Sequence, residues 1–391
     1  MVKTGLSLIL ENFPAGLRNR RIGILCHAPS IDKEYRHITD LFHERPDCRL
    51  TAIFGPQHGM FGETQDNMIE WTGALHPIWK IPVYSLYGEH RKPTHEMLSN
   101  IDVLVIDLQD VGARLYTYAW TIKLCMEACA EANIPVWILD RPNPVSRLRY
   151  DGPVLKEDYF TFVGGAEIPL CHRMTLGEIA VWVREKHVSG CDLNIVAMKG
   201  WNRSMMYNET GLPWVIPSPN MPTLQSAVVY PGMVLFEAMN ISEGRGTTIP
   251  FELFGAPFVD VFQLIKTLEG RDIPGCRFRV HNFIPTFNKF KGLLCNGLQL
   301  HVTNTDSFRP VATALEIIDA LIETSPPDAV KFNPPPYEYE YNLFPFDILS
   351  GDDRMRKVLG NRESLKQEKE RWNEEIDEFR KEFRKVALYK E

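Results

Sequence analysis

The stretch that decides the fold is IDVLVIDLQDVGARLYTY, residues 101–118. It begins with the apolar, β-branched run 103–106, which is typical of a strand buried on both faces of a parallel sheet. Ligands of open α/β sheets sit just beyond the carboxyl ends of the strands. We therefore expect a binding crevice at the polar residues that follow this run, which are Asp107, Gln109, Asp110, Arg114 and Tyr116.

Asp107 and Asp110 could instead have a purely structural role. Asp is a favoured N-cap residue, so Asp107 and Asp110 could cap the next helix and pair with Arg114. The convergence of so many polar groups after one core strand favours the functional interpretation.

Four further runs have strand character, at residues 22–26, 49–54, 82–87 and 135–139. Helical patterns stand between several of them, at 34–43, 93–99 and 119–132. This alternation of strands and helices predicts an α/β fold with a doubly wound, mostly parallel sheet. No GxGxxG or Walker A sequence occurs, so a dinucleotide or nucleoside triphosphate has no support.

The loops after these strands carry further candidate side chains. Gln57, His58, Glu63 and Gln65 lie in the glycine-rich loop 55–67, although His58 could equally be a surface residue bonded to nearby backbone. Glu89 follows the run 82–87, and Asp140, Arg141 and Asn143 follow the run 135–139.

Around residue 150 the regular alternation of strands and helices changes. We therefore expect a first domain over 1–150, or as far as about 235, followed by a C-terminal portion over 151–391 that includes a smaller domain. The proline-rich segment 213–223 is rigid, so Ser218 and Asn220 are expected to be positioned rather than merely exposed. Loop 239–250, with Glu243, Arg245 and Thr247, could bind an anion through backbone N–H groups and arginine, or form a surface turn. Residues 325–346 are expected to form an ordered extended arm or linker, and the charged C-terminus a surface helix.

Composition limits the function classes. The 391 residues carry a formal net charge of −7, which argues against nucleic acid as the main partner. No apolar run approaches the ~20 residues that span a bilayer. The N-terminus resembles a first helix rather than a signal peptide, so we expect a cytoplasmic protein, or a periplasmic or secreted one if a leader was removed. The eight cysteines form no CxxC pair and are expected to be reduced thiols. No metal-ligand spacing occurs, so we expect no metal and no cofactor.

Nine motifs together resemble a bacterial family first described as a domain of unknown function, DUF1343. They span nearly the whole chain and are GPQHGMFG, VYSLYGEHRKPT, DVLVIDLQDVGARLYTYAWT, LDRPNP, DGPVL, FVGG, PSPNMPTLQSAVVYPG, SEGRGTTIPFELFGAP and PFDILSGDDRMRKVL. The family is associated with exo-acting β-N-acetylmuramidases of glycoside hydrolase family 171. The chain departs from the family at two positions, with Gln57 where many members have glutamate and Arg173 where glycine is usual. Many members are also secreted, whereas no leader is visible in this sequence.

The resemblance implies a Rossmann-like N-terminal domain, a smaller α+β domain and a site in the cleft between them. It implies removal of β-linked N-acetylmuramic acid from the non-reducing ends of peptidoglycan fragments, so the partner is a muramic-acid-containing glycan or muropeptide.

Most glycosidases use two carboxyl groups, although the substrate's acetamido group can replace the nucleophile. We favour Asp110 and Glu243 as catalytic residues, with His58 as a proton relay. Arg245, Arg141 and Arg114 are candidates for the lactyl carboxylate, and Asn220, Asn143 and Tyr116 for sugar hydroxyls or the acetamide. The other predicted substrate-binding residues are Gln57, Glu89, Asp107, Gln109, Asp140, His172, Ser218 and Thr247.

Two other classes remain open. A sugar-binding protein that kept the cleft and lost catalysis is favoured by Gln57. An amidase or esterase would use Ser85, Ser218 or Ser242 as nucleophile, but no GxSxG elbow frames any of them.

Overall fold

Within the stretch 101–118, residues Val103–Asp107 form β5, an interior strand of a seven-stranded sheet. The structure is a computed structural model that describes residues 1–390 except 63 and 67. The sheet has the order β3-β4-β2-β1-β5-β6-β9, and all pairs are parallel except the edge pair β3–β4. The remaining strands are β1 (Arg21–Cys26), β2 (Arg49–Gly55), β3 (Ala74–Leu75), β4 (Pro82–Ser85), β6 (Val136–Leu139) and β9 (Leu193–Val196).

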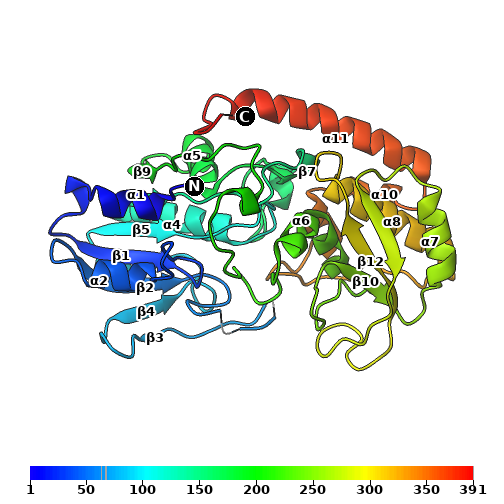
Figure 1. Cartoon of the computed structure of the whole chain (residues 1–391), viewed down its shortest axis with the longest axis horizontal. Coiled ribbons are helices and arrows are strands. Elements are labelled where there is room, and N and C mark those ends of the chain that lie inside the picture. Colours follow the sequence, from blue (N-terminus) through cyan, green and yellow to red (C-terminus); the bar gives the residue numbers. More distant parts are fainter. Residues whose placement is uncertain (63, 67, 391) are drawn as a thin grey trace.

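Helices cover both faces of this sheet, which confirms the predicted α/β class (Figure 1). Successive side chains of β5 point to opposite faces. Val103 and Val105 pack in one core with α1 (Gly5–Glu11) and α2 (Ile38–His43). Leu104 and Ile106 pack in a second core with α4 (Tyr118–Ala132) and α5 (Leu176–Lys186). The short helix α3 (His95–Leu98) contacts α4.

A second, smaller lobe follows from about residue 224. Its antiparallel sheet has the order β10-β12-β11, formed by β10 (Leu253–Ala256), β11 (Cys276–Val280) and β12 (Asn296–Val302). Its helices are α6 (Leu224–Met233), the 3-10 helix η4 (Val234–Ala238), α7 (Val261–Glu269), α8 (Pro310–Thr324), α9 (Pro345–Ser350) and α10 (Arg354–Val358). The last sheet strand of the first lobe is β9, so we propose a domain boundary near residue 225.

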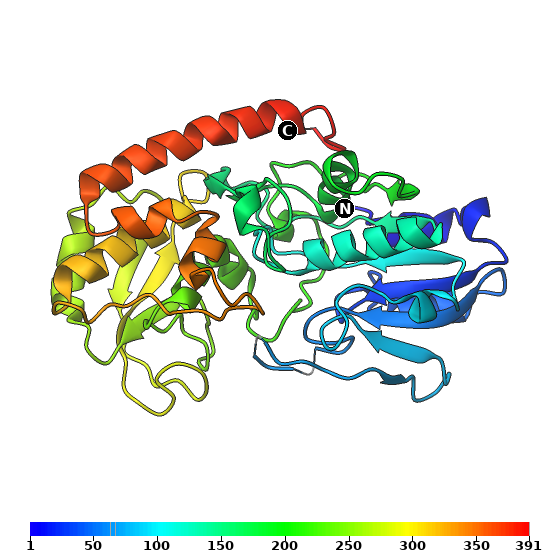
Figure 2. The same cartoon turned by 180° about the vertical axis from the view of Figure 1, so that it is seen from behind.

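The small two-stranded sheet of β7 (Asp151–Val154) and β8 (Pro169–Cys171) contacts α8 of the second lobe. The terminal helix α11 (Arg362–Phe383) runs along both lobes (Figure 2). Its Trp372, Ile376 and Phe379 are buried, as their spacing predicts.

After α11 the chain returns to the first lobe, where the Tyr389 hydroxyl donates to Asp140 Oδ2 at 2.6 Å. The C-terminal segment therefore ties the two lobes together.

Within the part of the chain that the structure describes, no helix is both long and apolar enough to cross a membrane. The same residues contain no cluster of three or more histidine, cysteine or acidic side chains that could hold a metal ion.

Candidate active site

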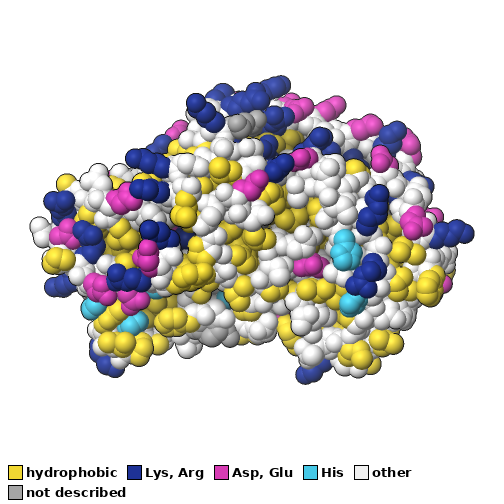
Figure 3. All heavy atoms as spheres, in the orientation of Figure 1, with side chains coloured by type: hydrophobic (Ala, Val, Ile, Leu, Met, Phe, Trp, Pro, Cys, Tyr) yellow, Lys and Arg dark blue, Asp and Glu magenta, His cyan; other side chains and the backbone are white. Residues whose placement is uncertain are grey.

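A pocket lies where the two lobes meet, and both lobes line it. It encloses about 440 Å³, counting the part open to solvent. In Figure 3 the outline of the molecule is notched at its lower edge between the two lobes. The polar residues of its lining are Gln57, His58, Tyr116, Thr117, Ser218, Asn220, Tyr230, Glu237, Arg245, Tyr337 and Glu338. The first two follow β2 and the next two follow β5, so the carboxyl edge of the sheet forms one wall, as expected for this fold.

Glu338 comes from the proline-rich arm between α8 and α9. Glu338 and Tyr339 form the tip of a tight turn, with φ values of 45° and 68°, closed by two hydrogen bonds of 2.9 Å between Tyr337 and Glu340. The left-handed conformation is unfavourable for side chains other than glycine, so the surrounding structure must hold this turn in place.

The surroundings of Glu338 raise the pKa of its carboxyl group to near neutral pH. Burial raises its pKa to about 7; the hydrogen bond from the Tyr87 hydroxyl, at 2.9 Å, opposes this shift, and the charge of Glu237 adds to it. A carboxyl group with a pKa near 7 can donate a proton at neutral pH, which is the property required of a general acid.

Glu237 is the second carboxyl group in the described lining of the pocket, and an arginine and a tyrosine donate hydrogen bonds to it. Arg245 Nη2 donates to Glu237 Oε1 at 2.5 Å, and the Tyr337 hydroxyl donates to its Oε2 at 2.7 Å. Burial disfavours the charge on Arg245, but Glu237 and Glu243 outweigh it and raise the arginine pKa. Glu237 is therefore held in place by Arg245 and Tyr337, in the same pocket as the proton-bearing Glu338.

His58 also lines the pocket and is neutral. Burial is the main reason that its pKa is lowered to about 4; the nearby charge of Arg245 adds to this shift and the Thr64 carbonyl opposes it. His58 Nδ1 lies 2.8 Å from the Thr64 carbonyl oxygen, so Nδ1 carries the proton. The adjacent Gln57 accepts a hydrogen bond from the Thr117 hydroxyl at 2.7 Å. Glu63, expected in the same loop, lies outside the described residues.

Three more predicted residues are in the pocket lining. They are Tyr116 after β5 and the pair Ser218 and Asn220 from the proline-rich segment. The Asn220 amide donates to the Gln65 carbonyl at 2.8 Å, which links this segment to the loop after β2.

Asp110 lies behind this lining rather than in it, among the residues described. Its Oδ2 accepts from the Gly112 amide at 2.8 Å and lies 3.7 Å from His172 Nε2. Burial raises the pKa of Asp110 to about 7, against the Gly112 hydrogen bond. Burial, with the charges of Arg114 and Arg203, lowers the pKa of His172 to about 3. Neither residue is in the described lining of this pocket, whereas Asp110 Oδ1 is buried without a hydrogen-bond partner, so the roles expected for Asp110 and His172 stay predictions.

Glu243 is placed outside the pocket as well. Its Oε2 accepts from Lys289 Nζ at 2.8 Å and its Oε1 lies 3.3 Å from Arg245 Nε. Burial favours the neutral form, but Lys289 and Arg245 outweigh it and lower the pKa of Glu243. A carboxylate that stays ionised cannot act as the acid, so its place in the structure favours a supporting role for Arg245.

Asp107 and Arg141 satisfy each other at the ends of β5 and β6. Arg141 donates from Nε and Nη2 to the two Asp107 oxygens at 2.5 and 2.8 Å, and both side chains are buried. Arg114 is fully buried and donates to the carbonyls of Pro153, Ile168 and Leu349. Neither arginine is in the described pocket lining, so the structure does not place them where a lactyl carboxylate would bind.

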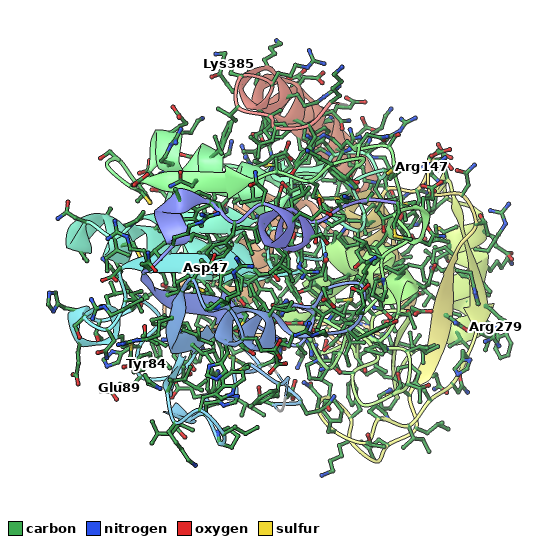
Figure 4. All side chains as sticks on the ribbon, turned by 60° about the vertical axis from the view of Figure 1, so that its left-hand side comes forward. Asp47, Tyr84, Glu89, Arg147, Arg279 and Lys385 are labelled. Atoms are coloured by element: carbon green, nitrogen blue, oxygen red, sulfur yellow. The ribbon has the colours of Figure 1, made fainter. Side chains whose placement is uncertain are left out.

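The remaining predicted residues bond to the backbone or to other side chains, or are exposed. Gln109 donates to the carbonyls of Asp110 and Pro142, Asn143 to that of Met174 and Thr247 to that of Gly244. Asp140 accepts from Tyr389 and Thr175. Glu89 is exposed at the outer edge of the sheet lobe (Figure 4), with 90% of its side chain accessible. None of these residues is therefore in the described lining of the pocket.

Sequence reasoning missed Tyr230, Glu237, Tyr337 and Glu338. The segment PPPYEYEY, residues 334–341, places acids between tyrosines in a proline-rich setting. Its prolines restrict the backbone as those of residues 213–223 do, and this rigidity is the signal in the sequence that points to Glu338.

The chain resembles known proteins over its full length. It matches the family models for the exo-beta-N-acetylmuramidase NamZ, with the N-terminal part at residues 22–225 and the C-terminal part at 228–389. It is 41% identical over 388 residues to the peptidoglycan beta-N-acetylmuramidase NamZ of Bacillus subtilis, covering 99% of this chain and 91% of that protein.

Two crystal structures of DUF1343 family proteins from Bacteroides fragilis have the same fold. One has a TM-score of 0.87 at 32% identity, and the other 0.76 at 28% identity. Each comparison covers 100% of this chain and 99% of the other.

Proposed function

The chain belongs to the NamZ family of exo-β-N-acetylmuramidases, and from this membership and the pocket we propose that it is a glycoside hydrolase. It removes β-linked N-acetylmuramic acid from the non-reducing ends of peptidoglycan fragments. The substrate is a muramic-acid-containing glycan or muropeptide.

The main support for this proposal is that two carboxyl groups, those of Glu237 and Glu338, line one pocket with different hydrogen-bond partners. Glycoside hydrolysis needs a proton donor for the leaving oxygen and a second group that supports the developing positive charge or the nucleophile. Burial of Glu338 keeps a proton available near neutral pH. Arg245 and Tyr337 keep Glu237 oriented by hydrogen bonds. We assign Glu338 as the general acid and Glu237 as the second carboxyl group, which supports the developing positive charge or the nucleophile.

Substrate contacts follow from the rest of the lining. Tyr116, Ser218 and Asn220 offer hydroxyl and amide groups that suit sugar hydroxyls and the acetamide. Arg245 is the arginine of the pocket among the residues described, and it is our candidate for the lactyl carboxylate. Gln57 cannot donate a proton as an acid, so it is assigned to binding.

The function is tested by product analysis on peptidoglycan glycan strands that end in N-acetylmuramic acid. We expect mass spectrometry to detect released N-acetylmuramic acid as the first product. A second substrate ending in N-acetylglucosamine serves as the control and is expected to stay intact. Internal cleavage, or release from both substrates alike, would contradict an exo-acting muramidase.

One alternative is favoured by a specific observation, the glutamine at position 57. A protein of this fold that lost catalysis would still bind muramyl sugars in the same pocket. It would be recognised by protection of the fold against heat by N-acetylmuramic acid without any product release.

A further inference from the structure

Arg91, in the loop after β4, contacts the turn of the second lobe that carries Glu338, although it is not in the described lining of the glycosidase pocket. Its guanidinium carbon lies 3.6 Å from the centre of the Tyr339 ring. Tyr339 directly follows Glu338 at the tip of the turn. We propose that Arg91 is a positioning residue for the reaction, which holds Glu338 at the pocket from the side of the sheet lobe. This inference deepens the function proposed above and rests on it.

Three aromatic rings from three segments lie close to the Arg91 guanidinium. Besides the Tyr339 ring, its central carbon has the Tyr87 ring at 5.5 Å and the Phe162 ring at 5.4 Å. Tyr87 follows β4, and Phe162 belongs to the connection between β7 and β8. A guanidinium group is attracted to aromatic faces and stacks on them. Arg91 therefore joins the arm of the second lobe to two segments of the first.

Glu70 completes the contact between Arg91 and Tyr339. Its Oε1 lies 3.6 Å from Arg91 Nη2 and accepts a hydrogen bond of 2.9 Å from the Tyr339 hydroxyl. Tyr339 is thus held by its ring and by its hydroxyl, and both partners come from the sheet lobe. The Glu70 side chain is half exposed, so its ion pair with Arg91 contributes little by itself. The stacked ring is the main contact.

Arg91 supplies a planar face and a charge rather than hydrogen bonds. Its Nε and Nη2 are buried and have no hydrogen-bond acceptor among the residues described. A buried donor without an acceptor costs stability, so an arginine that served only to tie two loops together would be expected to use these donors. The arrangement favours a role for the charge and the flat face of the side chain, beside the turn that carries the proposed acid.

The turn depends on support from outside. Glu338 and Tyr339 both have left-handed φ values, and two hydrogen bonds between Tyr337 and Glu340 close the turn. Figure 2 shows the arm, in orange, crossing the second lobe toward the boundary with the sheet lobe. The contacts of Arg91 and Tyr87 with the tip of this arm therefore decide where the Glu338 carboxyl lies.

The charge of Arg91 also acts on Glu338. Burial raises the pKa of Glu338 to about 7, and the charge of Glu237 adds to this shift. The hydrogen bond from Tyr87 and the charges of Arg91 and Arg245 oppose the shift, because they favour the ionised carboxylate. Loss of the Arg91 charge is therefore expected to raise the pKa of Glu338 further.

Hydrogen exchange measured by mass spectrometry tests the positioning without a substrate. The amides of Tyr337 and Glu340 donate to each other's carbonyls across the turn, so their exchange reports whether the turn is held. Arg91→Gln is expected to accelerate exchange in residues 337–343 at least about fivefold. Tyr339→Leu removes the stacked ring and is expected to do the same.

The matched control is Arg45→Gln, in the sheet lobe. Arg45 also lies over an aromatic ring, that of Phe13 at 3.8 Å, and it pairs with Asp47 at 2.9 Å. Its side chain is 23% exposed, as is that of Arg91. We expect Arg45→Gln to leave exchange in residues 337–343 unchanged.

Steady-state kinetics on an N-acetylmuramic acid β-glycoside test the consequence for the reaction. Arg91→Gln is expected to lower kcat at least about tenfold, with a smaller change in KM, because the acid is misplaced. The basic limb of its kcat/KM profile is expected to move to higher pH. Arg91→Lys keeps the charge and loses the planar face, so we expect faster exchange in the turn with the basic limb in its original place.

Unchanged exchange in Arg91→Gln, or equal acceleration in Arg45→Gln, would overturn the proposal. Unchanged kcat and an unchanged pH profile in a folded Arg91→Gln variant would overturn it as well. Glu338→Gln tests the proposed function separately. If Glu338→Gln keeps full activity, the assignment of the acid fails, while hydrogen exchange in Arg91→Gln still decides whether Arg91 holds the turn.

Discussion

The Tyr87 hydroxyl of the sheet lobe donates a hydrogen bond of 2.9 Å to Glu338 Oε2 in the arm of the second lobe. The same phenol oxygen accepts from the Met68 amide at 3.1 Å. Burial and the charge of Glu338 raise the pKa of Tyr87, so the phenol stays a donor. The contact joins residues 251 positions apart, and it fixes the proposed acid at the boundary between the lobes.

Removing that donor is expected to move the pH profile. The hydrogen bond from Tyr87 lowers the pKa of Glu338, so Tyr87→Phe raises it above about 7. Activity that needs protonated Glu338 falls as pH rises through this pKa. We therefore expect the basic limb of the kcat/KM profile to shift to higher pH in Tyr87→Phe.

The control for this shift is Tyr339→Phe, because the Tyr339 hydroxyl donates to the exposed Glu70 and not to Glu338. If the basic limb stays in place in Tyr87→Phe, or moves equally in both variants, it does not report the pKa of Glu338.

Two buried glutamates, Glu237 and Glu243, lie beside Arg245, and we expect different roles for them. Glu237→Gln is expected to lower kcat/KM about 100-fold or more, in the range of lost electrostatic stabilisation at a reacting centre. Glu243→Gln leaves the partly buried Lys289 without its carboxylate partner, so it is expected to lower the thermal midpoint more than it lowers kcat. Comparison of steady-state kinetics with thermal denaturation checks this order, and the reverse order would return the catalytic role to Glu243.

Position 57 offers a direct comparison with family members that have glutamate there. Gln57→Glu keeps an oxygen that can accept the hydrogen bond from Thr117. If Glu338 is the acid, the change is expected to alter turnover less than about threefold, because the proton donor is already present. A gain of tenfold or more in kcat, measured at several pH values, would place the missing acid at position 57 instead.

Arg114 is expected to matter for stability rather than for substrate binding. Arg114→Met leaves three buried carbonyls, those of Pro153, Ile168 and Leu349, without their donor. We expect a loss of about 3 kcal/mol or more in the free energy of unfolding, measured by denaturant titration.

The exposed Arg147, labelled in Figure 4, pairs with Asp306 at 2.7 Å and supplies the control. Arg147→Met is expected to cost about 1 kcal/mol or less. Equal costs for the two substitutions would contradict the structural role of Arg114.

The fold was predictable because the apolar runs are strong and local. The run 103–106 alternates its side chains between two cores, and the buried stripe of Trp372, Ile376 and Phe379 follows from helical spacing alone. Both patterns depend only on neighbouring residues, so the sequence contains them in full.

The site was harder to predict because its residues meet only in three dimensions. Asp107 and Arg141 were rightly expected at one edge of the sheet, but nothing in the sequence shows that they satisfy each other. Glu338 reaches the pocket through a turn with left-handed φ values at the end of a proline-rich arm. Whether such an arm folds back or leads away is decided by tertiary contacts such as that with Tyr87.

The most direct test of the central claim is release of a chromophore from an N-acetylmuramic acid β-glycoside by the unaltered protein and by Glu338→Gln. We expect release by the unaltered protein, none from the N-acetylglucosamine analogue, and a loss of at least about 100-fold in a folded Glu338→Gln variant. Absence of release by the unaltered protein, or undiminished release by Glu338→Gln, would contradict this claim.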